Sequence, residues 1–145
     1  MINSVIDLYR DGLLTADQTA IIDEFLKLNK IAIEIDNGTI SDINNSLTDN
    51  IIKQRQQNYI YKKIPEIAKD RKELAEHLDF IPVHMSYWDT RNKAMAQNIL
   101  KQIENHPNKV IVVLTGYYHR YYLIEELESY QIKYGFTLNP LKETS

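Results

Sequence analysis

The run Val110-Ile111-Val112-Val113-Leu114 constrains the fold of this chain more than any other feature. An uninterrupted apolar run has no polar side to face water, which is typical of a strand covered on both faces in a parallel sheet. We therefore predict that residues 110–114 form the core strand of an α/β fold. In that fold a small, mostly parallel central sheet is flanked by helices.

Three weaker patterns predict further strands. Residues 30–36 alternate apolar with other residues and are rich in isoleucine before the turn signal Asn37-Gly38. The same residues could instead extend the preceding helix, because short apolar runs fit both periods. Residues 80–85 predict a short strand, and the alternating residues 132–138 predict a half-buried closing strand.

Helical spacing predicts the elements that flank the sheet. Apolar residues within 2–9 share one face, and Gly12 suits the left-handed position beyond the end of that helix. The segment Thr15-Ala16-Asp17-Gln18 has the form of a capping box and begins a second helix. Residues 48–78 form a polar helical arm, which Pro65 is predicted to break or kink because it lacks a backbone donor. The remaining predicted helices lie at residues 88–104 and about 119–130.

Length and composition indicate one soluble domain covering residues 1–145. The 17 basic and 20 acidic residues give a net charge of −3 and are interspersed, so we expect no nucleic-acid partner. The chain has no cysteine, so a metal would have to be held by histidines and carboxylates. The sequence shows neither a membrane span nor a signal peptide, which predicts a cytoplasmic location by default.

The turn Gly116-Tyr117-Tyr118-His119 follows the predicted core strand and is the first candidate site. Ligands gather at the carboxyl ends of parallel strands, where the next helix presents free backbone donors. Gly116 permits a sharp exit and a close approach of a ligand, and His119 offers a lone pair to a metal or a proton to a substrate. The alternative is that His119 is a surface or packing residue. The tyrosines around it either line a pocket for a flat ligand or cover the edge of the core.

Two charged residues are candidate partners of His119. Arg91 lies in the first turn of the predicted helix 88–104, where a cation opposes the helix dipole, so it is either aimed at an anionic group or an exposed structural residue. Glu34 ends the predicted strand 30–36 and would emerge beside His119 if the two strands are parallel; otherwise it faces solvent.

A family resemblance connects these residues. The series Trp88-Asp89-x-Arg91-Asn92-x-x-Met95-Ala96-x-Asn98-Ile99, followed by an apolar strand and Gly116-x-x-His119, resembles the carboxyl half of the TraB, Tiki and ChaN superfamily. The erythromycin-esterase-like proteins are its distant relatives. The resemblance spans about residues 86–128.

That resemblance implies an α/β fold related to metal-dependent hydrolases of peptide or ester bonds. It implies His119 and Arg91 as catalytic residues, Gly116 and Asn92 as ligand-binding residues, and His119 as a ligand of a divalent metal, joined by Glu34 if residues 30–36 are the family's second strand. Tyr118, in the tyrosine-rich turn, is a further candidate for ligand binding. The family's first Gly-x-x-His has no counterpart, because residues 1–30 contain no histidine. Either the chain is the carboxyl-terminal part of a longer protein, which could then be exported or associated with the cell envelope, or it is a non-catalytic member.

Two functions follow as hypotheses. The first is a TraB/ChaN-like hydrolase with a peptide or small-molecule substrate, in which His119 is a metal ligand or acid/base and Arg91 holds an anionic group. The second is a non-catalytic module in which the tyrosine-rich turn binds a flat ligand such as haem and the polar arm mediates self-association, giving a homo-dimer.

Overall fold

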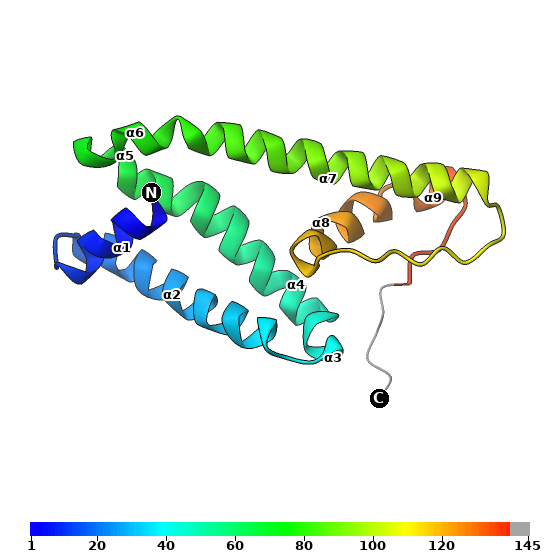
Figure 1. Cartoon of the computed structure of the whole chain (residues 1–145), viewed down its shortest axis with the longest axis horizontal. Coiled ribbons are helices and arrows are strands. Elements are labelled where there is room, and N and C mark those ends of the chain that lie inside the picture. Colours follow the sequence, from blue (N-terminus) through cyan, green and yellow to red (C-terminus); the bar gives the residue numbers. More distant parts are fainter. Residues whose placement is uncertain (140–145) are drawn as a thin grey trace.

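The computed structural model describes residues 1–139, and every regular element in that range is a helix (Figure 1). The elements are α1 (Ile2–Arg10), α2 (Ala16–Asp36), α3 (Ile40–Ile43), α4 (Ser46–Lys53), η1 (Gln54–Lys63), α5 (Ile64–Lys69), η2 (Lys72–Leu74), α6 (Ala75–Leu78), α7 (Phe80–Asn105), α8 (Tyr117–Glu128) and α9 (Gln131–Tyr134). Element η1 is a π-helix and η2 is a 3₁₀-helix. The predicted α/β fold is therefore wrong, and the described part of the chain is all-α. The last six residues of the predicted domain, 140–145, lie outside the described range.

The first two helices confirm the sequence signals that predicted them. Gly12 follows α1 with φ of 68°, the left-handed conformation that glycine adopts without a steric penalty. Thr15 and Gln18 form the predicted capping box, each side chain accepting a hydrogen bond from the other residue's backbone N–H. Both helices bury apolar residues in a common core with η1, α5 and η2. Its buried members are Val5, Ile22, Phe25, Tyr59, Ile64, Ile67, Ala68 and Leu74.

Residues 30–36 are the last turns of α2 rather than a strand. Ala32 and Ile35 are buried three positions apart, whereas Ile31 and Ile33 are exposed. This spacing continues the buried positions Ile22 and Phe25, so the helical period decides the conformation of the isoleucine-rich segment.

The other two weak strand predictions are also wrong. Residues 80–85 are the beginning of α7, and Pro82 fits there because the first turn of a helix leaves its backbone N–H groups without intrahelical acceptors. Residues 131–134 form the short helix α9, which Gly135 ends with φ of 64°. The residues described after it have no regular structure.

The polar arm is helical as predicted, but Pro65 does not interrupt it. Elements α4, η1 and α5 form one rod, which lies along α2 in Figure 1. The Ile64 N–H donates to Tyr59 O, five residues back, in the π-helical register. The change back to the α-helical register therefore falls beside Pro65, where one backbone donor is missing in any case.

Residues 110–114 were predicted as a strand, but within residues 1–139 they belong to no regular element. They are not the buried core strand that their composition predicted, because four of the five side chains are exposed. In Figure 1 the segment runs back from the end of α7 to the start of α8.

Helix α8 lies between α4 and α7 and packs against both. A second, smaller core forms where it meets α2 and α4, around Ala32, Ile52 and Tyr121. No helix in the described range is both long and apolar enough to cross a membrane, as the sequence predicted.

Candidate functional site

Side chains at the start of α8 tie that helix to three others. The Tyr117 hydroxyl donates to Asp36 at the end of α2, and the Tyr122 hydroxyl donates to Asp89 Oδ1 on α7 over 2.8 Å. Arg120 forms a largely buried ion pair with Asp49 on α4. These contacts hold the first turns of α8, and therefore His119, in a fixed position. Burial and the neighbouring carboxylate raise the pKa of the Tyr117 hydroxyl, so it remains a donor.

His119 lies against α7 and is held there by two side chains. Its imidazole stacks on the Trp88 indole, with ring centroids 4.3 Å apart and planes inclined by 15°. Its Nδ1 lies 2.6 Å from Asn92 Oδ1, and because a carbonyl oxygen only accepts, Nδ1 carries the proton. Nε2 is then the ring nitrogen with a free lone pair. Trp88 and Asn92 are four residues apart on α7 and present one surface to the imidazole.

The environment of His119 favours the neutral imidazole. Burial lowers its pKa, and the positive charge of Arg91 lowers it further. A neutral imidazole with a fixed tautomer can accept a proton or a hydrogen bond at Nε2 near pH 7.

Two buried N–H donors beside His119 have no hydrogen-bond partner among the described residues. They are Trp88 Nε1 and Asn92 Nδ2, and Asn92 has 0% of its surface exposed. Both donors are closed off from the pocket, and the Tyr121 hydroxyl is a neighbour of Trp88 that can act as an acceptor.

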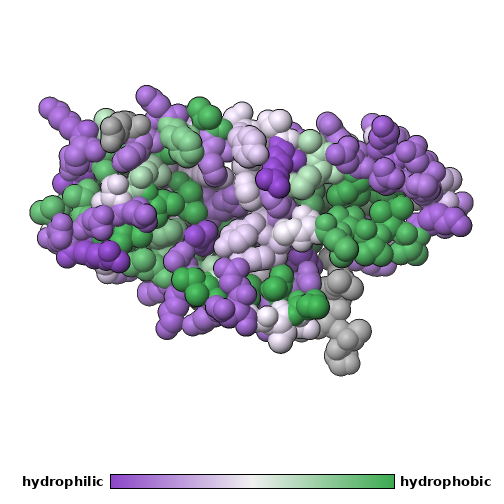
Figure 2. Space-filling view, in the orientation of Figure 1, coloured by the Kyte–Doolittle hydropathy of each residue, from purple (hydrophilic) through white to green (hydrophobic). Residues whose placement is uncertain are grey.

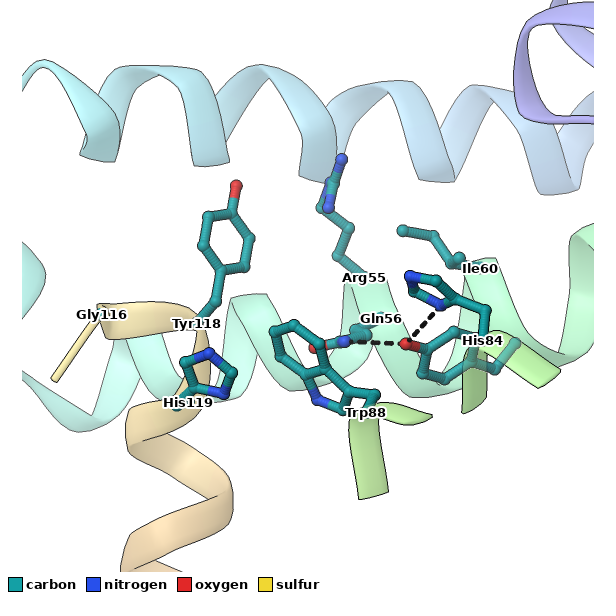
Figure 3. A pocket seen from close by; sticks show the side chains of 9 residues that line it. Arg55, Gln56, Ile60, His84, Trp88, Gly116, Tyr118 and His119 are labelled. Carbon is teal, nitrogen blue, oxygen red and sulfur yellow. Dashed lines mark hydrogen bonds between the residues drawn. The ribbon is translucent and has the colours of Figure 1, made fainter. Parts of the chain in front are cut away.

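A pocket of about 410 Å³ opens beside the Trp88–His119 pair, within the range of small-molecule sites (Figure 3). Helix α7, the start of α8 and the π-helix η1 supply its walls. Aromatic and histidine rings make up most of the lining. The residues are Arg55, Gln56, Ile60, Tyr61, His84, Trp88, Gly116, Tyr118 and His119.

A directed chain of hydrogen bonds crosses the wall formed by η1. The buried Tyr121 hydroxyl donates to Gln56 Oε1 over 3.2 Å, and Gln56 Nε2 donates to the Tyr61 hydroxyl over 3.0 Å. Tyr61 then has its own proton free for His84 Nδ1 at 3.2 Å. Burial raises the pKa of Tyr61, and it raises that of Tyr121 to about 12, so both hydroxyls keep their protons near neutral pH.

This direction fixes the tautomer of His84. Because Nδ1 accepts from Tyr61, a neutral His84 carries its proton on Nε2. His119 has the opposite tautomer, with the lone pair on Nε2. The pocket is therefore lined by one imidazole that donates and one that accepts.

The structure brings most of the predicted ligand-binding residues together. His119, Gly116 and Tyr118 line the pocket, and Asn92 holds His119. The sharp exit predicted for Gly116 does not need a glycine. It precedes α8 with φ of −64° and ψ of 137°, a conformation open to any residue.

Arg91 and Glu34 differ from their predicted settings. Arg91 is exposed in the interior of α7, which begins at Phe80, so the argument from the helix dipole fails. The positive charge of Arg91 nevertheless contributes to the lowered pKa of His119. Glu34 lies exposed on α2 and not at a strand end beside His119.

The described residues do not supply the implied metal site. Among them, no three His, Cys, Asp or Glu side chains lie close enough together to hold an ion. His119 has Asn92 at Nδ1 and Trp88 on its face, and neither of these side chains is a usual metal ligand. We derive no catalytic step through a metal.

Sequence reasoning missed the contributions of Trp88, Gln56 and Tyr61 to the pocket. Trp88 precedes Asn92 by four residues in the predicted helix 88–104, and this spacing places both on one face. Gln56 and Tyr61 lie in the π-helix, where five residues separate neighbours on a face. A search at α-helical spacing therefore cannot align them.

Comparisons of the chain with protein-family models, characterised proteins and solved structures found no match. The resemblance to the TraB, Tiki and ChaN superfamily therefore stays a prediction based on the residues quoted above.

Proposed function

We propose that the chain binds a small planar molecule in the pocket between α7, α8 and η1. The observation that carries this proposal is the imidazole of His119, stacked on Trp88 with its proton fixed on Nδ1 by Asn92. A ring or amide that offers both a donor and an acceptor matches the lone pair of His119 and the Nε2 proton of His84. The aromatic lining supplies faces for stacking.

One further feature supports binding over a purely structural role. The hydrogen bonds from Tyr121 to His84 already order the side chains of the opposite wall. Little further side-chain entropy is therefore lost when a ligand binds.

Hydrolysis is the second candidate, because the lowered pKa of His119 suits a general base. In that function Nε2 would take a proton from an attacking water, and Arg91 would attract the developing negative charge. Haem would be an alternative planar ligand, and His119 Nε2 would then supply the nitrogen that holds its iron.

Tryptophan fluorescence tests these functions directly, because Trp88 is the only tryptophan in the chain and lines the pocket. We would titrate the protein with adenine and nicotinamide as planar heterocycles and with hemin, and measure hydrolysis of p-nitrophenyl acetate in parallel. Saturable quenching by a heterocycle is the expected result. Hydrolysis without any quenching would favour the second candidate, and a Soret shift with hemin alone would favour haem.

Two matched variants assign the effect to the pocket. His119→Gln removes the Nε2 acceptor and should weaken binding about tenfold, the effect of losing roughly one hydrogen bond to a buried partner. His106→Gln makes the same change at an exposed histidine after α7 and should bind like the wild type. Equal affinities for all three proteins, or no quenching by any probe, would overturn the proposal.

A further inference from the structure

Arg55 brings a positive charge to the wall of the pocket. It lies on η1, is half-buried, and lines the pocket together with His84 and His119. Its Nε and Nη2 both donate to Asn29 Oδ1 on α2, over 3.0 and 2.8 Å. This partner is a neutral amide, and no carboxylate whose position the structure describes pairs with Arg55. The guanidinium is therefore held in place while its charge is not compensated.

The π-helical register of η1 presents Arg55 to the pocket. Five residues separate neighbours on one face of a π-helix, so Arg55 stands in line with Ile60, and Gln56 with Tyr61. All four residues line the pocket. In an α-helix, residues five apart diverge by about 140°, which would turn one member of each pair away. The unusual register therefore gives this wall its cation.

The pocket has a charged end and an aromatic end. In Figure 3 Arg55 extends from η1 toward α2 between Tyr118 and Ile60, whereas the stacked rings of Trp88 and His119 lie on the other side. The lining contains no Asp or Glu, and His119 favours the neutral form. An anion that enters the pocket therefore meets a cation and no opposing carboxylate.

The surface around the pocket suits a polar ligand. Helix α8 begins in the middle of the molecule, between α7 and the rod that contains η1 (Figure 1). In the same orientation, Figure 2 shows mainly residues of intermediate or hydrophilic character across the middle, and the broad hydrophobic areas lie toward the two ends. A charged ligand therefore does not have to cross an apolar surface.

The guanidinium of Arg55 keeps a free edge for such an anion. An arginine carries five N–H donors in a rigid fork, and Asn29 takes one from Nε and one from Nη2. The remaining N–H groups of Nη1 and Nη2 include a parallel pair that matches the two oxygens of a carboxylate. One guanidinium also balances the single charge of a carboxylate, whereas a phosphate ester carries about two charges.

We propose that the pocket binds a planar heterocyclic carboxylate, whose ring lies beside the Trp88–His119 pair and whose carboxylate accepts hydrogen bonds from the free edge of Arg55. This inference rests on the proposed function, because it needs a ligand in that pocket. It adds the charge and the chemical class of that ligand.

A matched pair of compounds tests the charge. Uracil-6-carboxylate and uracil-6-carboxamide are both planar, carry the same ring donors and acceptors, and differ in the charge of one substituent. We would titrate the full chain with each by isothermal titration calorimetry at about pH 7.5. The carboxylate should bind about tenfold more tightly than the amide, the difference expected between a charge-assisted and a neutral hydrogen bond.

Three variants assign this affinity ratio to Arg55. Arg55→Met removes the charge but keeps an unbranched apolar side chain, and should reduce the ratio to about one; a purely structural Arg55 would lower both affinities alike and leave the ratio unchanged. Asn29→Asp keeps an acceptor for Arg55 and compensates its charge in place, so the ratio should fall in a chain that is packed as before. Lys62→Met removes a charge from an exposed position on the same π-helix and should retain the wild-type ratio.

The outcomes separate this inference from the proposed function. Equal affinities of the two compounds for the wild type, or a ratio that survives both Arg55→Met and Asn29→Asp, would overturn the inference and leave the proposed function standing. Binding of neither compound, while adenine still quenches Trp88, would also overturn the inference alone. If no planar compound binds at all, both are overturned.

Discussion

His119 is the residue on which the candidate site depends, and its protonation should be visible in stability. Its pKa is lowered in the folded protein, so between that value and the ordinary value near 6.5 the unfolded chain binds more protons. The free energy of unfolding should therefore fall as the pH drops below about 6.5 and level off below the folded pKa. The carboxylates with lowered pKa values, Asp42 and Asp89, act only in more acidic solution.

Urea denaturation between about pH 5 and pH 7 measures this dependence. His119→Gln should flatten it because the titrating group is gone, and His106→Gln should leave it as in the wild type. An unchanged slope in His119→Gln would mean that another group is responsible.

The ion pair between Arg120 and Asp49 joins α8 to α4 and is more buried than the Lys53–Glu125 pair between the same helices. The side chains of Arg120 and Asp49 are only 12% and 17% exposed. Arg120→Met should cost about 3 kcal/mol at pH 7, because it leaves the carboxylate buried without its partner. Burial already raises the pKa of Asp49, so the loss should shrink in acid as Asp49 becomes protonated.

An exposed pair provides the control for this prediction. Lys27 and Glu24 are 68% and 55% exposed, so Lys27→Met should change the free energy of unfolding by less than about 1 kcal/mol. Chemical denaturation of Arg120→Met and Lys27→Met measures the two losses in the free energy of unfolding. Equal losses would show that burial does not strengthen the Arg120 pair.

At the scale of residues, the sequence predicted identities better than roles. His119 and Tyr118 were found because they follow the apolar run in a glycine turn, and Asn92 because it is part of the motif that carries the resemblance; the three do gather at one place. The resemblance could not give the tautomer of His119, since that depends on Asn92 Oδ1, 27 positions away. Arg91 was placed in a first turn only because the start of α7 was predicted too late.

Glycines show how backbone conformation, rather than residue type, decides what an element tolerates. Gly12 has φ of 68°, so Gly12→Ala should cost about 1 kcal/mol. Gly116 has a conformation open to alanine, and an added Cβ would make only an ordinary contact of 3.8 Å with His119 Cδ2. Gly116→Ala should therefore leave stability unchanged or raise it by up to about 1 kcal/mol.

Thermal and urea denaturation of both variants test the comparison. The opposite order, with Gly116→Ala the less stable variant, would show that the start of α8 needs a glycine. It would also restore the role that the sequence suggested for the turn.

At the scale of elements, the capping and glycine signals predicted helix ends correctly, whereas the choice between helical and strand periodicity was wrong for the short apolar segments. The capping box at Thr15 and the glycine after α1 were predicted correctly, because they depend on a few adjacent residues. Residues 30–36 and 80–85 are short apolar stretches that fit both periods, and they became helical because each continues the buried face of a longer helix. The π-helical register of η1 has no signal in composition or spacing that we could have used.

At the scale of the whole molecule, the α/β prediction failed because it rested on one segment. Residues 110–114 have the composition of a buried strand, yet they belong to no regular element, and within residues 1–139 there is no sheet to receive them. Composition is a local property, whereas strand pairing and burial depend on segments distant in sequence.

The two cores should divide the molecule into parts of unequal stability. The larger core joins α1, α2, η1, α5 and η2, whereas α8 is held by the small core and by its polar ties to α2, α4 and α7. Native-state hydrogen exchange should therefore show that α8 opens at a lower free energy than α2 and α5, as a local unit.

Leu123→Ala, a buried truncation in α8, should cost about 2–5 kcal/mol in that local opening and leave exchange in α2 nearly unchanged. Ile22→Ala, in the large core, should instead speed exchange in every helix, because it lowers the stability of the whole chain. If Leu123→Ala destabilised α2 as much as α8, the chain would unfold as a single unit and the pocket could not open independently of the larger core.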